Sequence, residues 1–436
     1  MSAIAARRPP PPYRKGWCPG ALRPMETGDG LLARVRAPQA RLSLDQALAL
    51  AAAAMACGNG LMVLSARANL HLRGLSEPTL PELHARLGDA GLIDADPEIE
   101  RLRNIIISPV DDLDPDAEFD LGVSVSALET RLREDERLRQ LPAKFGIVLD
   151  AKGRLPLNDV DADIRFEAQR DGTFAVFLGG EDALCGECAP VQTGEIAARL
   201  GLSFMALAGA GEAAPRRMRA LIEETGAAAV FAEAACEAKP GARSKRGASL
   251  SDVLGGHAYG GLVVVGAAAA FGEFEAVRFK ALIERARALG ATGLRLTPWR
   301  AFMIAGLEPR AAAAMEKACA KLGFICDSGD QRLRIAACPG APACMHGARP
   351  ARDDAAQWAV LLPNGEGVVL HVSGCAKGCA RPAATAATLT ATAAGYDLIV
   401  AGRAGDPPAR RGLKSAEVAA LLAGEGTLMF GPGGRP

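Results

Sequence analysis

Four cysteines near the C-terminal end of the chain have the residue type and the spacing of iron–sulfur ligands. Cys338 and Cys344 are separated by five residues, and Cys375 and Cys379 by three. Both pairs lie among Gly, Pro and Ala, which let the backbone approach a bulky inorganic core. Four thiolates are the ligand set of a 4Fe–4S cluster, and this is the group that the sequence predicts here.

Two other interpretations of these cysteines stay open. The thiols could be buried or disulfide-linked, or they could bind a single zinc ion, although structural zinc sites usually have closer spacings of about two to four residues. The chain has 11 cysteines, an odd number that includes clustered ones. This usage is more typical of a reducing compartment with a metal centre than of a secreted disulfide framework.

Composition bounds the class of protein. A chain of 436 residues, 49% of them hydrophobic, is expected to form about two to four domains. The formal net charge is +0, so the composition does not show the excess of basic residues that is typical of nucleic-acid-binding proteins. Met1–Trp17 lacks the apolar core of a signal peptide, and we expect it to form an N-terminal arm. The apolar run Ala47–Cys57 is too short to span a bilayer. We therefore expect a soluble, cytoplasmic protein that binds neither nucleic acid nor a membrane.

The first part of the chain has the pattern of a small unit of strands and one helix. Ser43 begins the helix, with Gln46 as its partner in a capping box, and Gly58 ends it. The pair Gly74-Leu75 closes the last strand. The strands expected here are Leu31–Val35, Leu61–Leu64 and Asn69–Leu72.

The same order of elements recurs at one constant offset in the second half of the chain. A strand is expected over Leu262–Val265, Gly290 corresponds to Gly58, and Gly306 corresponds to Gly74. This agreement indicates an internal duplication. The helix of the second copy has apolar residues at helical period, namely Phe279, Leu282, Ile283, Ala286 and Leu289.

The longer segments that follow each copy are also alike. Arg103–Pro109 aligns with Arg334–Pro339, which places Ser108 where Cys338 stands. We therefore expect that the first copy has Ser108 and the segment around Lys144 where the second copy has cysteines, and that only the second copy binds a cluster. Alternating strands and helices in both segments predict an α+β or mixed α/β fold.

The remaining cysteines are expected to be structural. Cys185 and Cys188 form a Cys-x2-Cys pair, but no second pair stands near them, so a loop with incidental thiols is predicted. The polar and basic stretch Pro240–Ser251 is the best linker before the second copy. Small core residues are predicted at Cys57, Cys236, Cys319 and Cys326.

The cysteine pairs on a duplicated scaffold resemble those of the sulfite and nitrite reductase superfamily. Within it, the chain looks most like the precorrin-3B synthase family of aerobic cobalamin biosynthesis. The resemblance covers nearly the whole chain after the arm. The segments that carry it are Lys15–Gly20, Gly28–Leu31, Leu141–Gly146 and His371–Cys379.

The resemblance implies an α+β fold in which a sulfite/nitrite-reductase-like scaffold is duplicated. Two ferredoxin-like half-domains each precede a larger α/β domain. The implied division is an N-terminal arm over 1–24, a first half-domain over 25–80, a first reductase-like domain without cluster over 81–245, a second half-domain over 246–310, and a second reductase-like domain with the 4Fe–4S cluster over 311–436.

The resemblance also implies a monooxygenase reaction. The family hydroxylates precorrin-3A with O2 and reducing equivalents and closes a γ-lactone from a ring acetate. It is described as having a 4Fe–4S cluster and a mononuclear non-haem iron, and no sirohaem is expected, since the substrate itself is a tetrapyrrole. Two alternatives remain, namely a sirohaem-dependent sulfite or nitrite reductase and a non-catalytic iron–sulfur electron carrier.

Residues for the substrate follow from the same resemblance. A precorrin has many carboxylates, which arginine forks bind through two parallel hydrogen bonds. Arg67 and Arg103 resemble tetrapyrrole-facing arginines, and Lys144 resembles a catalytic, substrate-binding lysine. Gly146 stands where a reductase has a second lysine, which weakens the reductase alternative. Further candidates are Arg23, Arg34 and Arg36, whereas Trp299 occupies the place of Arg67 in the second copy.

The iron ligands and the electron donor are less defined. Non-haem iron commonly binds two histidines and a carboxylate, but none of the five histidines begins a His-x-Asp or His-x-Glu pair, so no ligand is assigned. No G-x-G-x-x-G fingerprint follows a strand. We therefore expect NADH to act indirectly, through a separate reductase or ferredoxin. The histidines are His71, His84, His257, His346 and His371.

Overall fold

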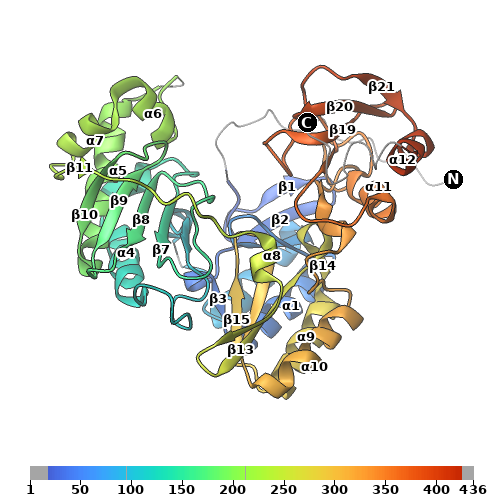
Figure 1. Cartoon of the computed structure of the whole chain (residues 1–436), viewed down its shortest axis with the longest axis horizontal. Coiled ribbons are helices and arrows are strands. Elements are labelled where there is room, and N and C mark those ends of the chain that lie inside the picture. The colour runs from blue at the N-terminus through green and yellow to red at the C-terminus, as the bar shows by residue number, and fades with distance from the viewer. Residues whose placement is uncertain (1–17, 95, 212, 425–436) are drawn as a thin grey trace.

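The structure is a computed structural model that describes residues 18–424 except Ala95 and Glu212. Two five-stranded sheets form the base of the molecule, and a further sheet lies above them on each side (Figure 1). The fold is α+β, as expected. The arm predicted over 1–24 lies outside the described residues as far as Trp17. None of the helices within the described part of the chain is long and apolar enough to cross a membrane.

The first half-domain is an antiparallel sheet with helices on one face. Helix α1 begins after Ser43, and the capping box with Gln46 is confirmed. Apolar side chains alternate along the strands toward this helix, as Ala33 and Val35 do. The elements are β1 (Met25–Thr27), β2 (Gly30–Val35), α1 (Leu44–Cys57), β4 (Leu61–Leu64), β5 (Leu70–Leu75) and α2 (Leu80–Asp89).

The second half-domain repeats this arrangement, which confirms the duplication. Arg34 pairs with His71 across two strands of the first sheet, and Gly266 pairs with Met303 at the corresponding place in the second. The elements are β12 (Gly255–Tyr259), β13 (Leu262–Ala268), α9 (Ala276–Ala288), β15 (Gly293–Leu296), β16 (Ala301–Leu307) and α10 (Pro309–Lys321).

Each half-domain gives one short strand to the sheet of the other. Strand β3 (Arg41–Leu42) directly precedes α1 but pairs with β15, and β14 (Glu273–Glu275) directly precedes α9 but pairs with β4. Both crossing segments turn through a left-handed residue, Gln39 with φ 53° and Phe271 with φ 58°. The half-domains therefore cannot separate without breaking sheet hydrogen bonds.

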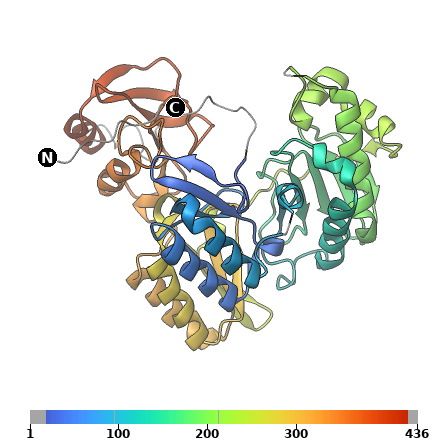
Figure 2. The same ribbon diagram turned by 180° about the vertical axis from the view of Figure 1, so that it is seen from behind.

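The helices of both half-domains form one layer beneath the two sheets (Figure 2). Helix α1 packs against α9, and the buried residues of both belong to one hydrophobic core. The apolar face predicted for α9 is confirmed at Phe279, Leu282, Ile283 and Ala286, which are buried. The shared core and the exchanged strands make the two half-domains one rigid base.

The first α/β unit has a six-stranded sheet in the order β11-β10-β9-β8-β7-β6. Strands β6, β7 and β8 are parallel, and the others are antiparallel. The strands are β6 (Ile105–Ile107), β7 (Ile147–Asp150), β8 (Ile164–Ala168), β9 (Phe174–Leu178), β10 (Leu184–Cys188) and β11 (Lys239–Pro240).

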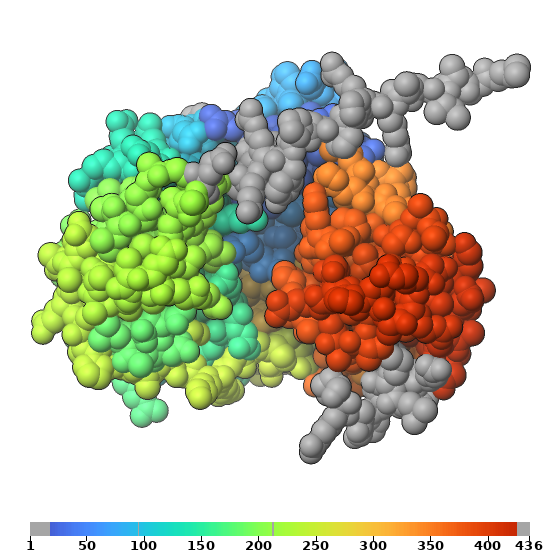
Figure 3. Space-filling view, turned by 90° about the horizontal axis from the view of Figure 1, so that it is seen from above, coloured from blue at the N-terminus to red at the C-terminus, as the bar shows by residue number. Residues whose placement is uncertain are grey.

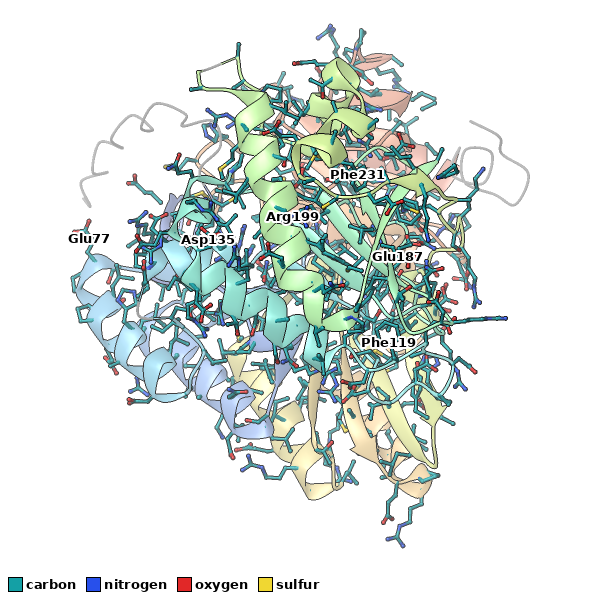
Figure 4. All side chains as sticks on the ribbon, turned by 90° about the vertical axis from the view of Figure 1, so that its left-hand side faces the viewer. Glu77, Phe119, Asp135, Glu187, Arg199 and Phe231 are labelled. Carbon is teal, nitrogen blue, oxygen red and sulfur yellow. The ribbon has the colours of Figure 1, made fainter. Side chains whose placement is uncertain are left out.

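Helices cover the outer face of this sheet. In Figure 4 two long helices, α4 and α5, lie across it, and Arg199 of α5 donates from Nε to the carbonyl of Ala234 at 2.7 Å. This bond ties α5 to the end of α7. The helices are α3 (Pro97–Leu102), α4 (Gly122–Glu134), α5 (Thr193–Ala208), α6 (Met218–Thr225) and α7 (Ala227–Glu233).

The second α/β unit has the same strand order with fewer helices. Its sheet is β17-β18-β19-β20-β21, with the first three strands parallel and the rest antiparallel. The elements are β17 (Ile335–Ala337), α11 (Ala351–Trp358), β18 (Leu370–Ser373), β19 (Thr385–Ala391), β20 (Tyr396–Gly402), β21 (Arg410–Leu413) and α12 (Ser415–Gly424).

The prediction of a loop at Cys185–Cys188 is wrong. This segment is strand β10, and both thiols are buried in it. Burial raises the pKa of Cys188 to about 12, so this thiol stays protonated and unreactive at neutral pH. The predicted linker Pro240–Ser251 ends in the short helix α8 (Leu250–Val253).

A substitution in a crossing segment tests the exchange of strands. Gly272 has φ +75°, and a Cβ there would lie 2.6 Å from the carbonyl oxygen of Leu64. We expect Gly272→Ala to lower the free energy of unfolding by about 2 kcal/mol, because the left-handed backbone and the clash both oppose the side chain. Urea denaturation measures this change.

Gly88→Ala is the matched control for Gly272→Ala. Gly88 lies in α2, where an added Cβ meets nothing within 4 Å. Alanine in a helix is favoured over glycine by about 0.5–1 kcal/mol, so this variant is expected to be slightly more stable than the parent. Equal stability of the two variants would contradict the importance of the crossing segment.

Candidate functional site

The two cysteine pairs lie in loops that follow neighbouring parallel strands. Cys338 comes directly after β17, and Cys375 comes two residues after β18. Because β17 and β18 pair in parallel, their carboxyl ends meet at one edge of the sheet. The loop 338–347 and the loop 374–379, which we call the cluster loops, are therefore side by side although the sequence separates them.

Glycines let the cluster loops come together. A Cβ on Gly374 would lie 2.8 Å from the Cα of Gly340 and 3.3 Å from Sγ of Cys338. The backbone N–H of Gly374 donates to this Sγ at 3.0 Å. The thiolate is the form of cysteine that binds iron, and this N–H is placed to donate to it.

The four thiols share one environment. Desolvation, together with the neighbouring thiols of Cys338, Cys375 and Cys344, raises the pKa of Cys379. Among the described residues, no group of three or more His, Cys, Asp or Glu side chains could hold a metal ion as the side chains now stand. Each thiolate of a cubane cluster binds a separate iron atom, so its ligands stand further apart than those of one ion. The donor set and the glycine cradle fit a 4Fe–4S cluster.

The first α/β unit has the same loop backbone without cysteines. Ser108 N–H donates to the Leu149 carbonyl at 3.1 Å, as Cys338 N–H donates to that of Val372 at 3.3 Å. The alignment of Ser108 with Cys338 is therefore correct. Asp114 N–H donates to the carbonyl of the residue four positions earlier at 2.8 Å, as Cys344 does at 2.7 Å. Asp114 thus stands in the place of Cys344.

The expected role of the Lys144 segment in this alignment is wrong. Leu149 of β7 corresponds to Val372 of β18, so the residue three positions later, Lys152, stands in the place of Cys375. Lys144 precedes β7 and has its counterpart before β18. Lys144 therefore lies before β7, at the opposite end of this strand from Lys152, the residue in the place of Cys375.

Hydrogen bonds join the two loops of the first unit where the second unit has the cysteines. Asp150 is fully buried and accepts from Ser108 Oγ at 3.2 Å and from Lys152 N–H at 2.9 Å. Asp114 accepts from Arg154 N–H at 2.7 Å. Lys152 forms an ion pair with Glu167. These contacts provide hydrogen-bond partners for the polar groups of the two loops. None of these side chains is a thiolate, the ligand type that the second unit has here.

The sheet of the first half-domain has a cationic face, formed by Arg34, Arg36 and Arg73 around His71. Arg34 lies on β2, Arg36 directly follows it, and His71 and Arg73 lie on β5. All four alternate with core residues and so lie on the side opposite α1. Arg34 Nε donates to His71 Nε2 at 3.1 Å. Burial and the surrounding arginines, Arg34 first, hold the pKa of His71 well below its usual value, so the imidazole is neutral at pH 7.

The equivalent face of the second half-domain is apolar. The positions that correspond to the cationic face are occupied by Gly266, Ala268, Met303 and Ala305. Here Ala268, Met303 and Ala305 pack with Val253 and Leu254 at the end of α8. The face of the second half-domain is therefore buried in a hydrophobic core, whereas the equivalent face of the first half-domain has charged side chains.

Figure 3 shows the surface hollowed between the two α/β units, with residues of the first half-domain at the base of the hollow. Arg34 is half-buried, and beyond the bond to His71 its side chain has no partner among residues 18–424 as described. Arg300 donates to the Ala380 carbonyl beside Cys379 at 3.4 Å. The site is thus a basic surface that adjoins the cluster loops.

Arg67 lies at the tip of the β4–β5 turn, against the first α/β unit. Its Nε donates to Asn104 Oδ1 at 3.0 Å. A Cβ on Gly146 would lie 2.3 Å from its Nη2, so the absence of a side chain at 146 makes room for the guanidinium. Burial, with Arg217 nearby, lowers the pKa of Arg67. Its terminal nitrogens have no partner within the described part of the chain.

The other predicted site residues have different surroundings. Arg103 forms an ion pair with Asp94 at 2.9 Å and donates to the Arg36 carbonyl at 3.0 Å, so its charge is largely compensated. Lys144 is exposed and has no hydrogen bond or ion pair with another described residue. Arg23 forms an ion pair with Glu98 on the surface.

Sequence reasoning missed Arg73, Arg300 and Arg352. Arg352 forms an ion pair with Glu273 of the exchanged strand β14. The alternation of Arg34 with Arg36 and of His71 with Arg73 along two strands was the available signal. It could be read only with the strand register, because either face of a strand can be the buried one.

The histidines do not assemble an iron site. His84 and His257 bond to backbone carbonyls of Ala21 and Leu254, and His71 lies among arginines. His371 is fully buried, and neither ring nitrogen has a partner in the described structure. Burial and Arg381 lower the pKa of His371 to about 4. The described residues therefore assign no ligand set to a mononuclear iron.

Comparisons with known proteins agree with this architecture. Residues 23–90 match the family described as the nitrite/sulfite reductase ferredoxin-like half domain. The solved structure of the Mycobacterium tuberculosis NirA protein superimposes with a TM-score of 0.72 over 90% of this chain and 79% of that chain, at 18% identity. This likeness shows the fold alone.

Two curated relatives show to which family within this group the chain is most similar over its length. A ferredoxin–nitrite reductase of Synechococcus elongatus is 32% identical over 176 residues, which cover 38% of this chain and 34% of that protein. A precorrin-3B synthase of Sinorhizobium sp is 34% identical over 411 residues, which cover 91% of this chain and 84% of that protein. The chain therefore belongs to the precorrin-3B synthase family, within the nitrite and sulfite reductase superfamily, and it is an enzyme of the oxidoreductase type.

Proposed function

We propose that the protein is a precorrin-3B synthase of aerobic cobalamin biosynthesis, which hydroxylates precorrin-3A with O2 and a reductant and forms a γ-lactone. One observation carries the proposal: the cationic face contacts the first cluster loop, where Arg73 Nη2 donates to the Ala343 carbonyl at 2.8 Å. The first supplies the charges that a polycarboxylate needs. The second supplies the thiolates that an electron-transfer cluster needs.

Arg34 and Arg67 are the main candidates for substrate binding. Both have guanidinium nitrogens without partners in the described structure, and each arginine binds a neutral acceptor, His71 and Asn104 respectively. Neutral acceptors orient the side chains but leave their positive charge uncompensated. Such forks bind carboxylates through paired hydrogen bonds. Arg103 contributes as a weaker site, because Asp94 already balances it.

Lys144 is proposed as a catalytic and substrate-binding residue. Its ammonium is exposed and lies two residues before Gly146, beside the place of Arg67. An unpaired ammonium close to Arg67 can bind a ring carboxylate and can donate a proton. The large macrocycle needs room as well as charge, and the missing side chain at Gly146 leaves space for Arg67 to turn toward it.

Cys338, Cys344, Cys375 and Cys379 are proposed to hold the 4Fe–4S cluster. When bound, it supplies electrons one at a time. The electrons are proposed to come from a separate reductase or ferredoxin, with NADH as the indirect source. The protein contributes the N–H of Gly374 to one sulfur and arginines that favour negative charge nearby.

The overall reaction balances with one O2 and two electrons. One oxygen atom enters the macrocycle as a hydroxyl group, and the other leaves as water together with two protons and the two electrons. The ring acetate closes onto the neighbouring carbon as the lactone: the π bond between that carbon and the hydroxylated carbon breaks, and the hydroxyl oxygen takes up the proton that the acetate has lost. The cationic face holds this acetate as a carboxylate, which is its nucleophilic form.

Spectra and metal content separate this function from the alternatives. Anaerobically purified protein is expected to contain about four iron atoms per chain with cluster absorption, more if a mononuclear iron is present, and no tetrapyrrole band. A stoichiometric sirohaem band would support a sulfite or nitrite reductase instead. Lack of turnover of precorrin-3A with O2 and reductant would support a non-catalytic carrier.

Cys375→Ser tests the cluster ligands. A serine hydroxyl is a poor replacement for a thiolate, so this variant is expected to lose the cluster and all turnover. Iron analysis and visible absorption measure the loss. Cys236→Ser is the matched control, because this half-buried cysteine lies in the first α/β unit, and it is expected to retain the iron of the parent. Full iron content in Cys375→Ser would refute the assignment.

Arg67→Ala tests the substrate site. The variant is expected to keep the cluster but to bind the precorrin about 10-fold more weakly or worse, because a charged hydrogen bond contributes about 1.5–3 kcal/mol. Gly146→Ala is expected to act in the same direction by displacing the guanidinium. Titration of the holoprotein with substrate gives both dissociation constants. An unchanged affinity in Arg67→Ala would count against this residue.

A further inference from the structure

The turn between β1 and β2 contains Gly28 and Asp29, to which the function above assigns no role. Asp29 is bound by Arg73 of β5 in a fork, with Nε–Oδ2 2.9 Å and Nη2–Oδ1 2.7 Å. Thr27 Oγ1 also donates to Oδ1 at 2.8 Å, and Asn59 Nδ2 donates to Oδ2 at 3.2 Å. The carboxylate is thus fully bonded, and it fixes the direction of the Arg73 side chain.

The same group grips the first cluster loop. Arg73 Nη2 donates to the carbonyl of Ala343 at 2.8 Å, and the N–H of Gly28 donates to this carbonyl at 3.2 Å. Ala343 directly precedes Cys344. A Cβ on Gly28 would lie 1.9 Å from the carbonyl oxygen of Pro342, so only glycine allows this approach. Two hydrogen bonds from the first half-domain therefore converge beside a cluster cysteine.

The duplication supplies an internal comparison. The β12–β13 turn of the second half-domain has Gly260 and Gly261 at the positions of Gly28 and Asp29, and Ala305 at that of Arg73. A Cβ on Gly260 or Gly261 would meet nothing within 4 Å. The acid and the arginine occur only in the half-domain that faces cysteines. In the other, the loop has Ser108 and Asp114, and the turn has no clamp.

We propose that Gly28, Asp29 and Arg73 form a clamp that positions the Cys344 loop for the 4Fe–4S cluster and joins it to the cationic face. The inference rests on the proposed cluster. Arg73 is a positioning residue: it lies on the cationic face, and its side chain holds the carbonyl next to Cys344. The clamp keeps Cys344 in place while the negative thiolates repel one another, which slows the departure of the cluster.

Release of the cluster from the holoprotein tests the clamp. Anaerobic protein is mixed with an iron chelator below its unfolding temperature, and the loss of cluster absorption is followed. Arg73→Met is expected to release the cluster about 10-fold faster, the change that follows the loss of one charge-assisted hydrogen bond. The reduction potential of the cluster in this variant is expected to become more negative, because a cation near the cluster is lost. Arg73→Lys is expected to restore the potential and part of the rate.

Two further variants keep the test decisive. Gly28→Ala preserves every charge but blocks the approach of the loop, so it is expected to speed release without a comparable shift in potential. Arg86→Met removes an exposed arginine whose ion pair with Glu82 lies on α2, and it is expected to behave as the parent does. A clamp that acts on the cluster therefore predicts two different results. Loss of the charge in Arg73→Met changes both the release rate and the reduction potential, whereas loss of the contact in Gly28→Ala changes mainly the release rate.

The outcomes separate this inference from the proposed function. If Arg73→Met and Gly28→Ala release the cluster at the rate of Arg86→Met, the clamp is refuted while the cluster assignment stands. If the parent protein contains no iron–sulfur cluster after anaerobic purification, both are refuted. If Arg73→Met loses its cluster only when the chain unfolds, as circular dichroism reports, Arg73 has a merely structural role and the clamp is refuted.

Discussion

The exchange of one short strand between the half-domains is the constraint on which the other parts depend. Strands β3 and β14 each complete the sheet of the other copy, and α1 and α9 share one core. The two sheets are therefore fixed relative to each other. Each half-domain leads into an α/β unit, so this base also determines how far apart the two units stand and what lies at the bottom of the hollow between them.

The two copies have diverged in opposite directions on the same backbone. One half-domain face has Arg34, His71 and Arg73, while its counterpart has small or apolar residues and is covered. One α/β unit has cysteines in its loops, while its counterpart has a buried aspartate bonded to a serine and a lysine N–H. A closed polar network and an open thiolate set are two ways to satisfy the same pair of loops.

The positive charge of the site is costly, and the structure shows how it is tolerated. Arg36 is buried against Glu100, and burial lowers its pKa to about 10. Arg73 is neutralised by Asp29. Arg34 and Arg67 bond to neutral groups and keep terminal nitrogens free of partners in the described structure. The arginines that support the scaffold are thus paired with carboxylates, whereas Arg34 and Arg67 are not, and an anionic ligand would complete these two.

Much of the fold was readable in the sequence because it depends on local patterns. The capping box at Ser43, the strand over Leu61–Leu64 and the apolar period of α9 are properties of neighbouring residues, and the structure confirms them. The offset between Gly74 and Gly306 predicted the duplication. The type and spacing of the four cysteines predicted a metal centre, since those thiols lie close together in sequence.

Contacts between distant segments were not readable. Which cations share a face depends on the register of β2 with β5. The alignment of Lys152, rather than the Lys144 segment, with Cys375 depends on where the parallel strands end. The clamp joins Gly28 and Arg73 to Ala343, which lies 270 residues from Arg73. The sequence by itself determined the local elements and the ligand types, and only the tertiary structure decided which residues they contact. The reason is that local propensity favours many strand registers equally, and packing and strand pairing select one of them.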